Sequence, residues 1–197
     1  MRKMFNNRNN KIIVIAAITI LGLIGLFAFS NFKITRSRTS ADTKSSKYEF
    51  GDPKIELDIL YLYVEGNSRF ANNLESKLEI IMISKGIDVI LTEELVEKYD
   101  NQVLAVLISE KDIGYNPLIP SAEMEILFAY FLNGNTSYLE EIRLGEPLVI
   151  SFTEEGLIKE GKILISDQTQ GLVSYRAYVK YLANYSANQI YNQLPEN

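Results

Sequence analysis

The sequence predicts an α+β fold class: one N-terminal transmembrane helix, then a single domain with a mixed, mainly antiparallel sheet and two packed helices. Three observations predict it. An uncharged apolar run lies near the N-terminal end, over residues 12–29. A strand–helix–strand pattern follows over residues 55–91. Alternating segments then lead to a long amphipathic stretch at the C-terminal end. Strand-rich and helical segments in this order are typical of a sheet covered by a few helices.

The apolar run extends from Ile12 to Phe29 and contains no charge, with Thr19 as its only polar side chain. At 1.5 Å per residue, it is about long enough to cross the roughly 30 Å hydrocarbon core of a bilayer. We therefore expect a transmembrane helix over residues 12–32, with the lipid bilayer as the partner of the run from Ile12 to Phe29.

A cleaved signal peptide is the alternative for the same run. Arg2 and Lys3 provide a basic start, and the small residues Ala28 and Ser30 precede a possible cut before Asn31. The apolar run is longer than the roughly 7–15 residues of a typical signal-peptide core. Its length favours a retained signal-anchor, and cleavage remains open.

The predicted organisation has four parts. They are a basic cytoplasmic tail (1–11), the transmembrane helix (12–32), a flexible polar linker (33–53) and an extracytoplasmic α+β domain (54–197). Basic residues flank the apolar run almost evenly, but a short N-terminal tail usually stays inside. We expect a single-pass protein of the cell membrane, with a cytoplasmic N-terminus and the C-terminal domain outside.

Charge and composition exclude several function classes. Residues 1–50 hold nine Lys and Arg against two Asp and Glu, whereas residues 51–197 hold eleven against twenty-three. A domain this acidic repels phosphate backbones, so we expect no nucleic-acid partner. The chain has no Cys and no His, which excludes disulfides, thiolate nucleophiles, imidazole bases and the common zinc ligands.

Residues 55–91 are predicted to form a βαβ unit. A strand over 55–64 leads into a helix that Ser68 caps and Gly86 ends, and a short strand over 87–91 follows. The turn before the helix, GNSR, could in principle bind a phosphate at the helix N-terminus. Its single glycine favours a purely structural turn.

The middle of the chain is predicted as a short helix, a buried strand and a loop. Thr92 would cap a helix over 92–99, and the apolar run 103–109 is typical of a buried strand. The loop over 110–120 contains two prolines and several apolar residues. Such a loop either packs over the core or contacts a partner.

The second half is predicted as an antiparallel meander followed by a helix. Asn133-Gly134 is a strong hairpin signal, and a second turn is expected around residues 154–156. The predicted strands are 122–132, 137–144, 148–153 and 157–166. The amphipathic stretch 173–194, which includes five tyrosines, is predicted to be a helix packed on the sheet.

We predict no catalytic, cofactor-binding or metal-binding residue, and no enzyme activity. Adjacent acid pairs occur at Glu93-Glu94, Glu140-Glu141 and Glu154-Glu155. On a strand, neighbours of this kind point to opposite faces, which is poor geometry for a general acid and base. Two weaker possibilities stay open: a dyad of Ser109 with Lys111, and a calcium site around Asp112 and Asn116.

These observations predict a non-catalytic protein-interaction or envelope module with a protein partner. One alternative is a membrane-tethered hydrolase that uses Ser and Lys or carboxylates. Another is a sensor of a small ligand bound between the sheet and the C-terminal helix. Asn135 and Asn184 each begin an N-x-S/T sequon, and glycan attachment at either stays open.

Overall fold

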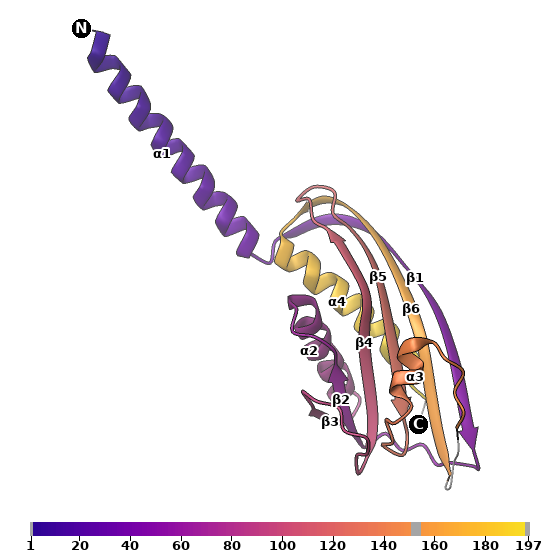
Figure 1. Cartoon of the computed structure of the whole chain (residues 1–197). Helices are drawn as coiled ribbons and strands as arrows, with labels where there is room; N and C mark the ends of the chain where they lie inside the picture. The colour runs from indigo at the N-terminus through magenta and orange to yellow at the C-terminus, as the bar shows by residue number, and fades with distance from the viewer. Residues whose placement is uncertain (1, 151–154, 196–197) are drawn as a thin grey trace.

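The computed structural model describes residues 2–150 and 155–195, with side chains for residues 11–27, 30–150 and 155–195. In this part of the chain, a six-stranded sheet and four helices form a mixed α+β fold (Figure 1). The strands are β1 (Lys33–Phe50), β2 (Ile59–Val64), β3 (Asp88–Leu91), β4 (Gln102–Gly114), β5 (Ser121–Phe131) and β6 (Gly156–Val173). The helices are α1 (Arg2–Phe29), α2 (Arg69–Ser84), α3 (Leu139–Leu144) and α4 (Tyr175–Tyr191).

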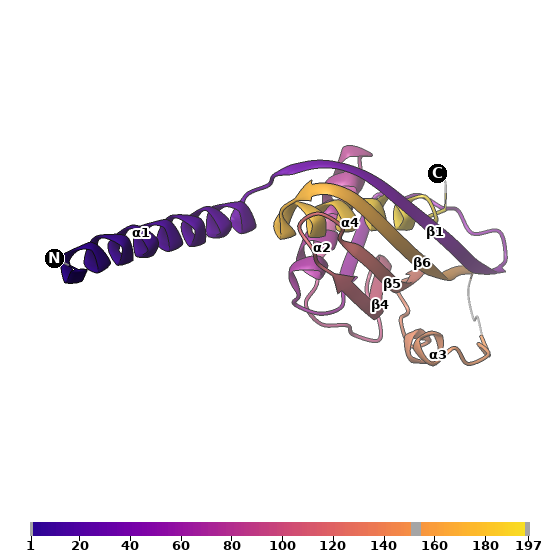
Figure 2. The same ribbon diagram turned by 90° about the horizontal axis from the view of Figure 1, so that it is seen from above.

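The strands lie in the order β1-β6-β5-β4-β2-β3. The β1–β6, β6–β5 and β5–β4 pairs are antiparallel, whereas β2 pairs in parallel with both β4 and β3. The predicted mixed, mainly antiparallel sheet is therefore confirmed. Figure 2 shows β1 as the outermost strand at one edge of the sheet.

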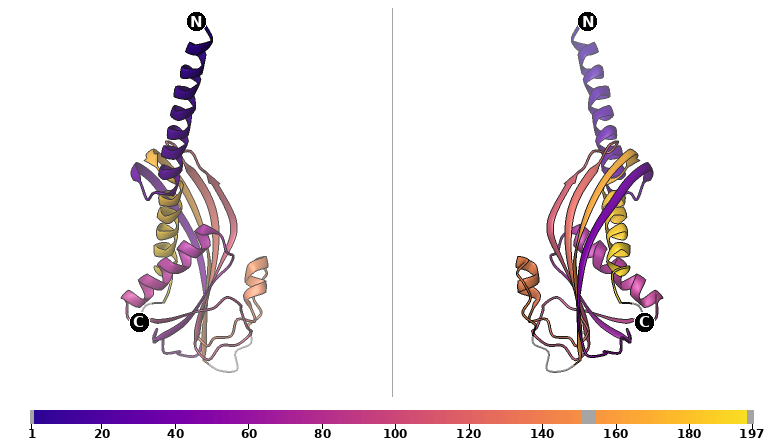
Figure 3. Two further views of the ribbon diagram at one scale, coloured as in Figure 1. Left: turned by 90° about the vertical axis from the view of Figure 1, so that its left-hand side faces the viewer. Right: turned by 90° about the vertical axis from the view of Figure 1, so that its right-hand side faces the viewer.

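Helices α2 and α4 cover one face of the sheet, and the short helix α3 lies on the opposite face (Figure 3). The larger core lies under α2 and α4 and includes Phe70, Leu74, Phe128, Tyr178 and Leu182, all at most 2% exposed. A smaller core beneath α3 joins buried side chains of β4 and β5 to Leu139 and Ile142.

The predicted βαβ unit is confirmed as β2–α2–β3. The Ser68 hydroxyl accepts a hydrogen bond from the Ala71 amide at 3.2 Å, so it caps α2 as expected. Gly86 follows the helix with φ at 85°, a left-handed conformation that glycine adopts without steric cost. These signals are local in sequence, so a single segment is sufficient to predict them.

Helix α1 requires a correction. Within the part of the chain that the structure describes, none of the helices combines the length and the apolar character that a membrane crossing requires. By this criterion the predicted transmembrane helix over 12–32, its single-pass signal-anchor and its bilayer contact from Ile12 to Phe29 are wrong. The location of the C-terminal domain outside the cell stays a prediction.

The predicted flexible linker over 33–53 is largely a strand. All 18 residues of β1 pair with β6 in one uninterrupted antiparallel register, from Lys33 opposite Val173 to Phe50 opposite Gly156. The segment shows no apolar alternation because most side chains of β1 on the side of α4 are polar. Thr39, for example, donates a hydrogen bond to the carboxylate of Asp167 at 2.6 Å.

Two predicted elements of the middle region are absent from the described structure. Residues 92–99 form bends and an isolated bridge at Lys98 instead of a helix. The chain does turn at Gly134, whose φ is 71°, but the segment after it forms helix α3 instead of a returning strand. Glu140 and Glu141 in the first turn, Arg143 in the last, and the left-handed Gly145 beyond it all favour this short helix.

The predicted second hairpin is also wrong in its described part. Residues 148–150 form no strand, and 151–154 lie outside the described residues. A single long strand, β6, then runs from Gly156 to Val173 and pairs with β5 on one side and β1 on the other. The C-terminal helix is confirmed as α4, which Ser174 caps.

Candidate interaction site

The two residues of the possible Ser–Lys dyad lie on an open strand. Ser109 sits at an irregularity in β4, where the register with β5 shifts between Ile108 and Glu110. Both Ser109 and Lys111 are exposed, and among the described residues no hydrogen bond joins them. This arrangement provides no enclosed cleft around the hydroxyl.

Two pairs of acidic residues lie opposite each other on strands β4 and β5. Glu110 of β4 lies opposite Glu125 of β5, and Asp112 lies opposite Glu123. The adjacent pairs Glu93-Glu94 and Glu140-Glu141 lie outside the sheet, and Glu154 is outside the described residues. The cross-strand pairs could not be found from sequence, because they depend on the register of β4 against β5.

The possible calcium site at Asp112 and Asn116 does not assemble. The Asn116 side-chain oxygen accepts a hydrogen bond from the Leu118 amide at 2.9 Å, within its own turn. In the described residues, no three or more carboxylate-bearing side chains are grouped so that they could hold a metal ion. The space between the sheet and α4, considered for a small ligand, is filled by core side chains such as Tyr178, Val179 and Leu182.

The outer edge of β1 is an extended, mostly polar surface over 18 residues. The backbone N–H of Ser174 donates a hydrogen bond to the carbonyl of Phe32 at 2.9 Å. This pair directly follows the last pair of the β1–β6 ladder, Lys33 opposite Val173. On the other side of β6, Thr169 and Gly171 donate to the segment that precedes β5. Hydrogen-bonded pairs alternate in an antiparallel ladder, so the even-numbered residues of β1 bond to β6. Its odd-numbered residues therefore direct their backbone N–H and C=O groups outward.

The charge of β1 is opposite to that of the domain it belongs to. The strand contains two acidic residues, Asp42 and Glu49, and five basic ones: Lys33, Arg36, Arg38, Lys44 and Lys47. Lys47 is paired with Glu49 at 2.5 Å. The exposed edge thus combines outward-directed backbone groups with a local excess of positive charge.

A buried carboxylate anchors this edge to α4. Asp167 of β6 is 1% exposed and accepts hydrogen bonds from Thr39, Thr169 and Tyr178 at 2.6, 2.9 and 2.7 Å. Thr39 also shares a short hydrogen bond with Tyr181 of α4. Because β1, β6 and α4 meet at one carboxylate, the middle of the edge is held in a defined position. No sequence motif marks this cluster, whose members come from three separate segments.

A hollow lies at the carboxyl ends of the parallel strands β2 and β3. It has a volume of about 680 Å³, and its lining includes Tyr63, Asn67, Asn72, Glu75 and Glu93. Burial raises the pKa of Glu75, and the nearby carboxylates of Glu79 and Glu93 raise it further. Because this environment disfavours the negative charge of Glu75, it is also unsuited to a phosphate. This agrees with the prediction that the GNSR turn has a purely structural role.

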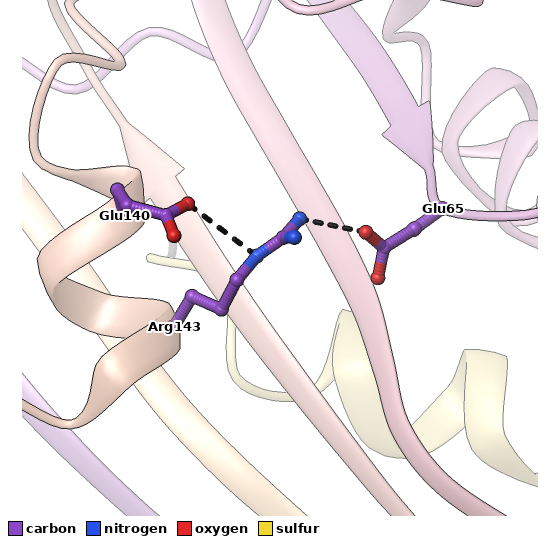
Figure 4. Close-up of polar contacts among 3 residues, drawn as sticks. All are labelled: Glu65, Glu140 and Arg143. Atoms are coloured by element: carbon purple, nitrogen blue, oxygen red, sulfur yellow. Dashed lines mark hydrogen bonds and ion pairs between the residues drawn. The ribbon is translucent and has the colours of Figure 1, made fainter.

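Next to this hollow, an ion pair joins β2 to α3. Arg143 binds Glu65 at 2.6 Å and lies 3.7 Å from Glu140, between the two carboxylates (Figure 4). Burial and the charge of Glu65 raise the pKa of the Tyr63 hydroxyl, and Arg143 opposes that rise. The ion pair connects α3 to the end of β2 above the smaller core. The guanidinium of Arg143 is thus already paired with carboxylates.

Apolar side chains are exposed in two further places. Along α1, large residues such as Leu21 and Leu26 are 67% and 73% exposed. In the loop that joins β4 to β5, Leu118 and Ile119 are exposed, while Tyr115 packs against Tyr175 and donates a hydrogen bond to the Val173 carbonyl. The loop therefore both packs on the domain and presents apolar surface. Apolar patches of this kind are typical of interaction surfaces.

No protein-family model matches the sequence, and neither does any curated protein. Among solved structures, the PelC dodecamer from Paraburkholderia phytofirmans is 11% identical, with a TM-score of 0.38 over 77% of this chain and 99% of that one. A single-residue variant of the same dodecamer is 9% identical, with a TM-score of 0.35 over 78% of this chain and 100% of that one.

A hypothetical protein from Chlamydia trachomatis is 8% identical, with a TM-score of 0.27 over 54% of this chain and 73% of that chain. Similarities of this size do not establish a shared function. The function is therefore argued from the surfaces of the chain itself.

Proposed function

We propose that this chain is a non-catalytic protein-interaction module that binds an extended segment of a partner protein along the free edge of β1. The observation that carries the proposal is the ladder geometry, which leaves every second residue of an 18-residue strand with outward backbone groups. Addition of a partner strand would satisfy these groups by the hydrogen bonding used within sheets.

The edge is not shortened, interrupted or covered in the ways that commonly prevent strand addition. Natural sheet edges are commonly short, interrupted by a bulge or proline, or covered by another element. β1 is long, contains no proline, and keeps one register with β6 from end to end. Among the described residues, no other strand pairs with its outer side.

The charge of β1 selects the partner. Two copies of β1 would each bring the same positive excess to a shared interface, and like charges on facing strands are unfavourable. A segment rich in Asp and Glu would place opposite charges beside Arg36, Arg38 and Lys44. Such pairs contribute to partner choice and to the rate of encounter.

A displayed library of extended peptides tests the proposal. Peptides selected on the full chain should be enriched in acidic residues, and their binding should slow hydrogen exchange at odd-numbered amides of β1. Ser45→Pro removes one outward N–H and inserts a ring at the edge, where proline is tolerated, so it should abolish binding. Ser45→Ala keeps the N–H and should bind normally.

Two results would overturn the proposal. One is selected peptides that bind Ser45→Pro as tightly as the unchanged chain. The other is protection that falls on another surface, such as the hollow beside Glu75. If Ser45→Pro does not fold, the exchange pattern of the unchanged chain still decides which surface is used.

A further inference from the structure

Three lysines from separate segments line one open hollow beside α4. The hollow has a volume of about 350 Å³ and is lined by Asn31, Lys33, Lys77, Ala177, Lys180, Tyr181 and Asn184. Lys33 opens β1, Lys77 lies in the middle of α2, and Lys180 lies on α4. No carboxylate is among the lining residues, although the domain as a whole is acidic.

These lysines lack the ion pairs that other basic residues of the chain make. Arg143, Lys47 and Lys162 each lie within 4.0 Å of a carboxylate. In the described part of the chain, no such pair involves Lys33, Lys77 or Lys180. The helices supply none, because Lys77 and Lys180 have no acidic residue three or four positions away.

The position of Lys33 is fixed by an aromatic ring. Its ammonium lies 3.3 Å from the centroid of the Tyr181 ring, a cation–π contact. Burial lowers the pKa of Lys33, and the charge of Asp167 partly opposes this. Asp167 is buried below and already accepts three hydroxyl hydrogen bonds, so it does not close the hollow to an external anion.

We infer that this three-lysine hollow binds a small ligand that carries a phosphate group. Three ammonium groups supply donors for phosphate oxygens, and Asn31 and Asn184 add neutral amide donors. The acidic surroundings disfavour an extended polyanion, so the ligand is a compact one. The hollow shares Lys33 with β1, and its other lining residues lie outside the strand along which the partner segment is proposed to bind.

Titration of the full chain with inorganic phosphate at constant ionic strength tests the inference. Lys77→Gln and Lys180→Gln should each weaken phosphate binding about tenfold, the size expected for one lost charge-assisted contact. Lys54→Gln removes the same charge from an exposed position outside the hollow and should leave the affinity unchanged. Equal affinity in all three variants would overturn the inference.

Vesicles distinguish a free phosphate from a lipid headgroup. Phosphatidylcholine vesicles with and without phosphatidic acid should be compared for the unchanged chain and Lys180→Gln. If phosphatidic acid increases vesicle binding and Lys180→Gln removes this increase, the bound phosphate belongs to a lipid headgroup. If inorganic phosphate binds in a Lys180-dependent way but phosphatidic acid does not increase vesicle binding, the phosphate belongs to a soluble ligand. Insensitivity of both measurements to Lys180→Gln would reject the site.

Discussion

The hydroxyl of Tyr178 donates a hydrogen bond to Oδ2 of Asp167 at 2.7 Å, and this contact joins helix α4 to strand β6 inside the core. Both residues are at most 1% exposed. Burial raises the pKa of Tyr178, and the hydrogen bond to the carboxylate raises it further. The tyrosine therefore stays protonated and keeps donating across the physiological range.

Tyr178→Phe should destabilise the domain by about 1.5–3 kcal/mol, the range for a hydrogen bond to a charged group. The phenylalanine ring fills the same space, so packing is retained. The loss of stability therefore comes mainly from the buried carboxylate of Asp167, which has one hydrogen-bond donor fewer. Chemical denaturation of the full chain measures it. Tyr185→Phe, for which no hydrogen bond is seen in the described structure, is the matched control. Equal effects of the two substitutions would contradict this account.

The two helix caps should differ in their contribution to stability. Ser68 caps α2 by accepting from the Ala71 amide, so Ser68→Ala should cost about 1 kcal/mol. Ser174 accepts from the Ala177 amide in the same way and also donates to the Ser30 carbonyl at 2.5 Å. Ser174→Ala should therefore cost about 1 kcal/mol more than Ser68→Ala. A smaller loss at Ser174 in thermal unfolding would indicate that the contact to Ser30 adds nothing.

Gly161 of β6 has no room for a side chain. A Cβ at this position would lie 2.6 Å from the Phe128 ring and 2.7 Å from the Lys44 carbonyl oxygen. Gly161→Ala should destabilise the sheet by about 1–3 kcal/mol, as overpacking typically does. At Gly114 the nearest obstacle is the Ser121 hydroxyl at 3.0 Å, which can rotate away. Gly114→Ala should cost clearly less, and the reverse order in denaturant midpoints would count against the close approach of β1 and β5 to Gly161.

The parts of the fold that could be predicted depend on local signals. The cap at Ser68, the helical spacing that begins at Phe70 and the glycine at position 86 all lie within one segment. Strand β1 could not be predicted in this way, because its inward side chains bond to Asp167, which is 128 positions from Thr39. A polar segment with no apolar face has the composition of a flexible linker. Its role as a strand becomes evident only from its pairing with β6.

The candidate sites were harder to predict for the same reason. Lys33, Lys77 and Lys180 belong to three segments that only the fold brings together. The outward backbone groups of β1 depend on the register with β6, which no single segment encodes. For α3, the sequence does contain usable signals: two acidic residues in the first turn and Gly145 after the last. The hairpin signal at Asn133-Gly134 competes with them, because it favours a returning strand over the same residues.

Glu75 should make stability depend on pH in a defined direction. Burial and the charges of Glu79 and Glu93 raise its pKa in the folded state above the ordinary value of 4.5. A raised carboxyl pKa means that the ionised form costs folding free energy. That cost is absent below the unfolded pKa, grows as pH rises through the folded pKa, and is complete at neutral pH.

Glu75→Gln should therefore stabilise the domain at pH 7 by about 0.2–0.5 kcal/mol, the size of a like-charge pair one helical turn apart. The gain should shrink as the pH falls through the folded pKa of Glu75 and disappear well below the unfolded pKa, where the carboxyl group is protonated in both states. Denaturation midpoints of the two proteins across this pH range measure the effect. Glu97→Gln, an exposed carboxylate outside this group, should give no such trend. A gain that persists unchanged at about pH 4 would mean that glutamine stabilises α2 for a reason unrelated to charge.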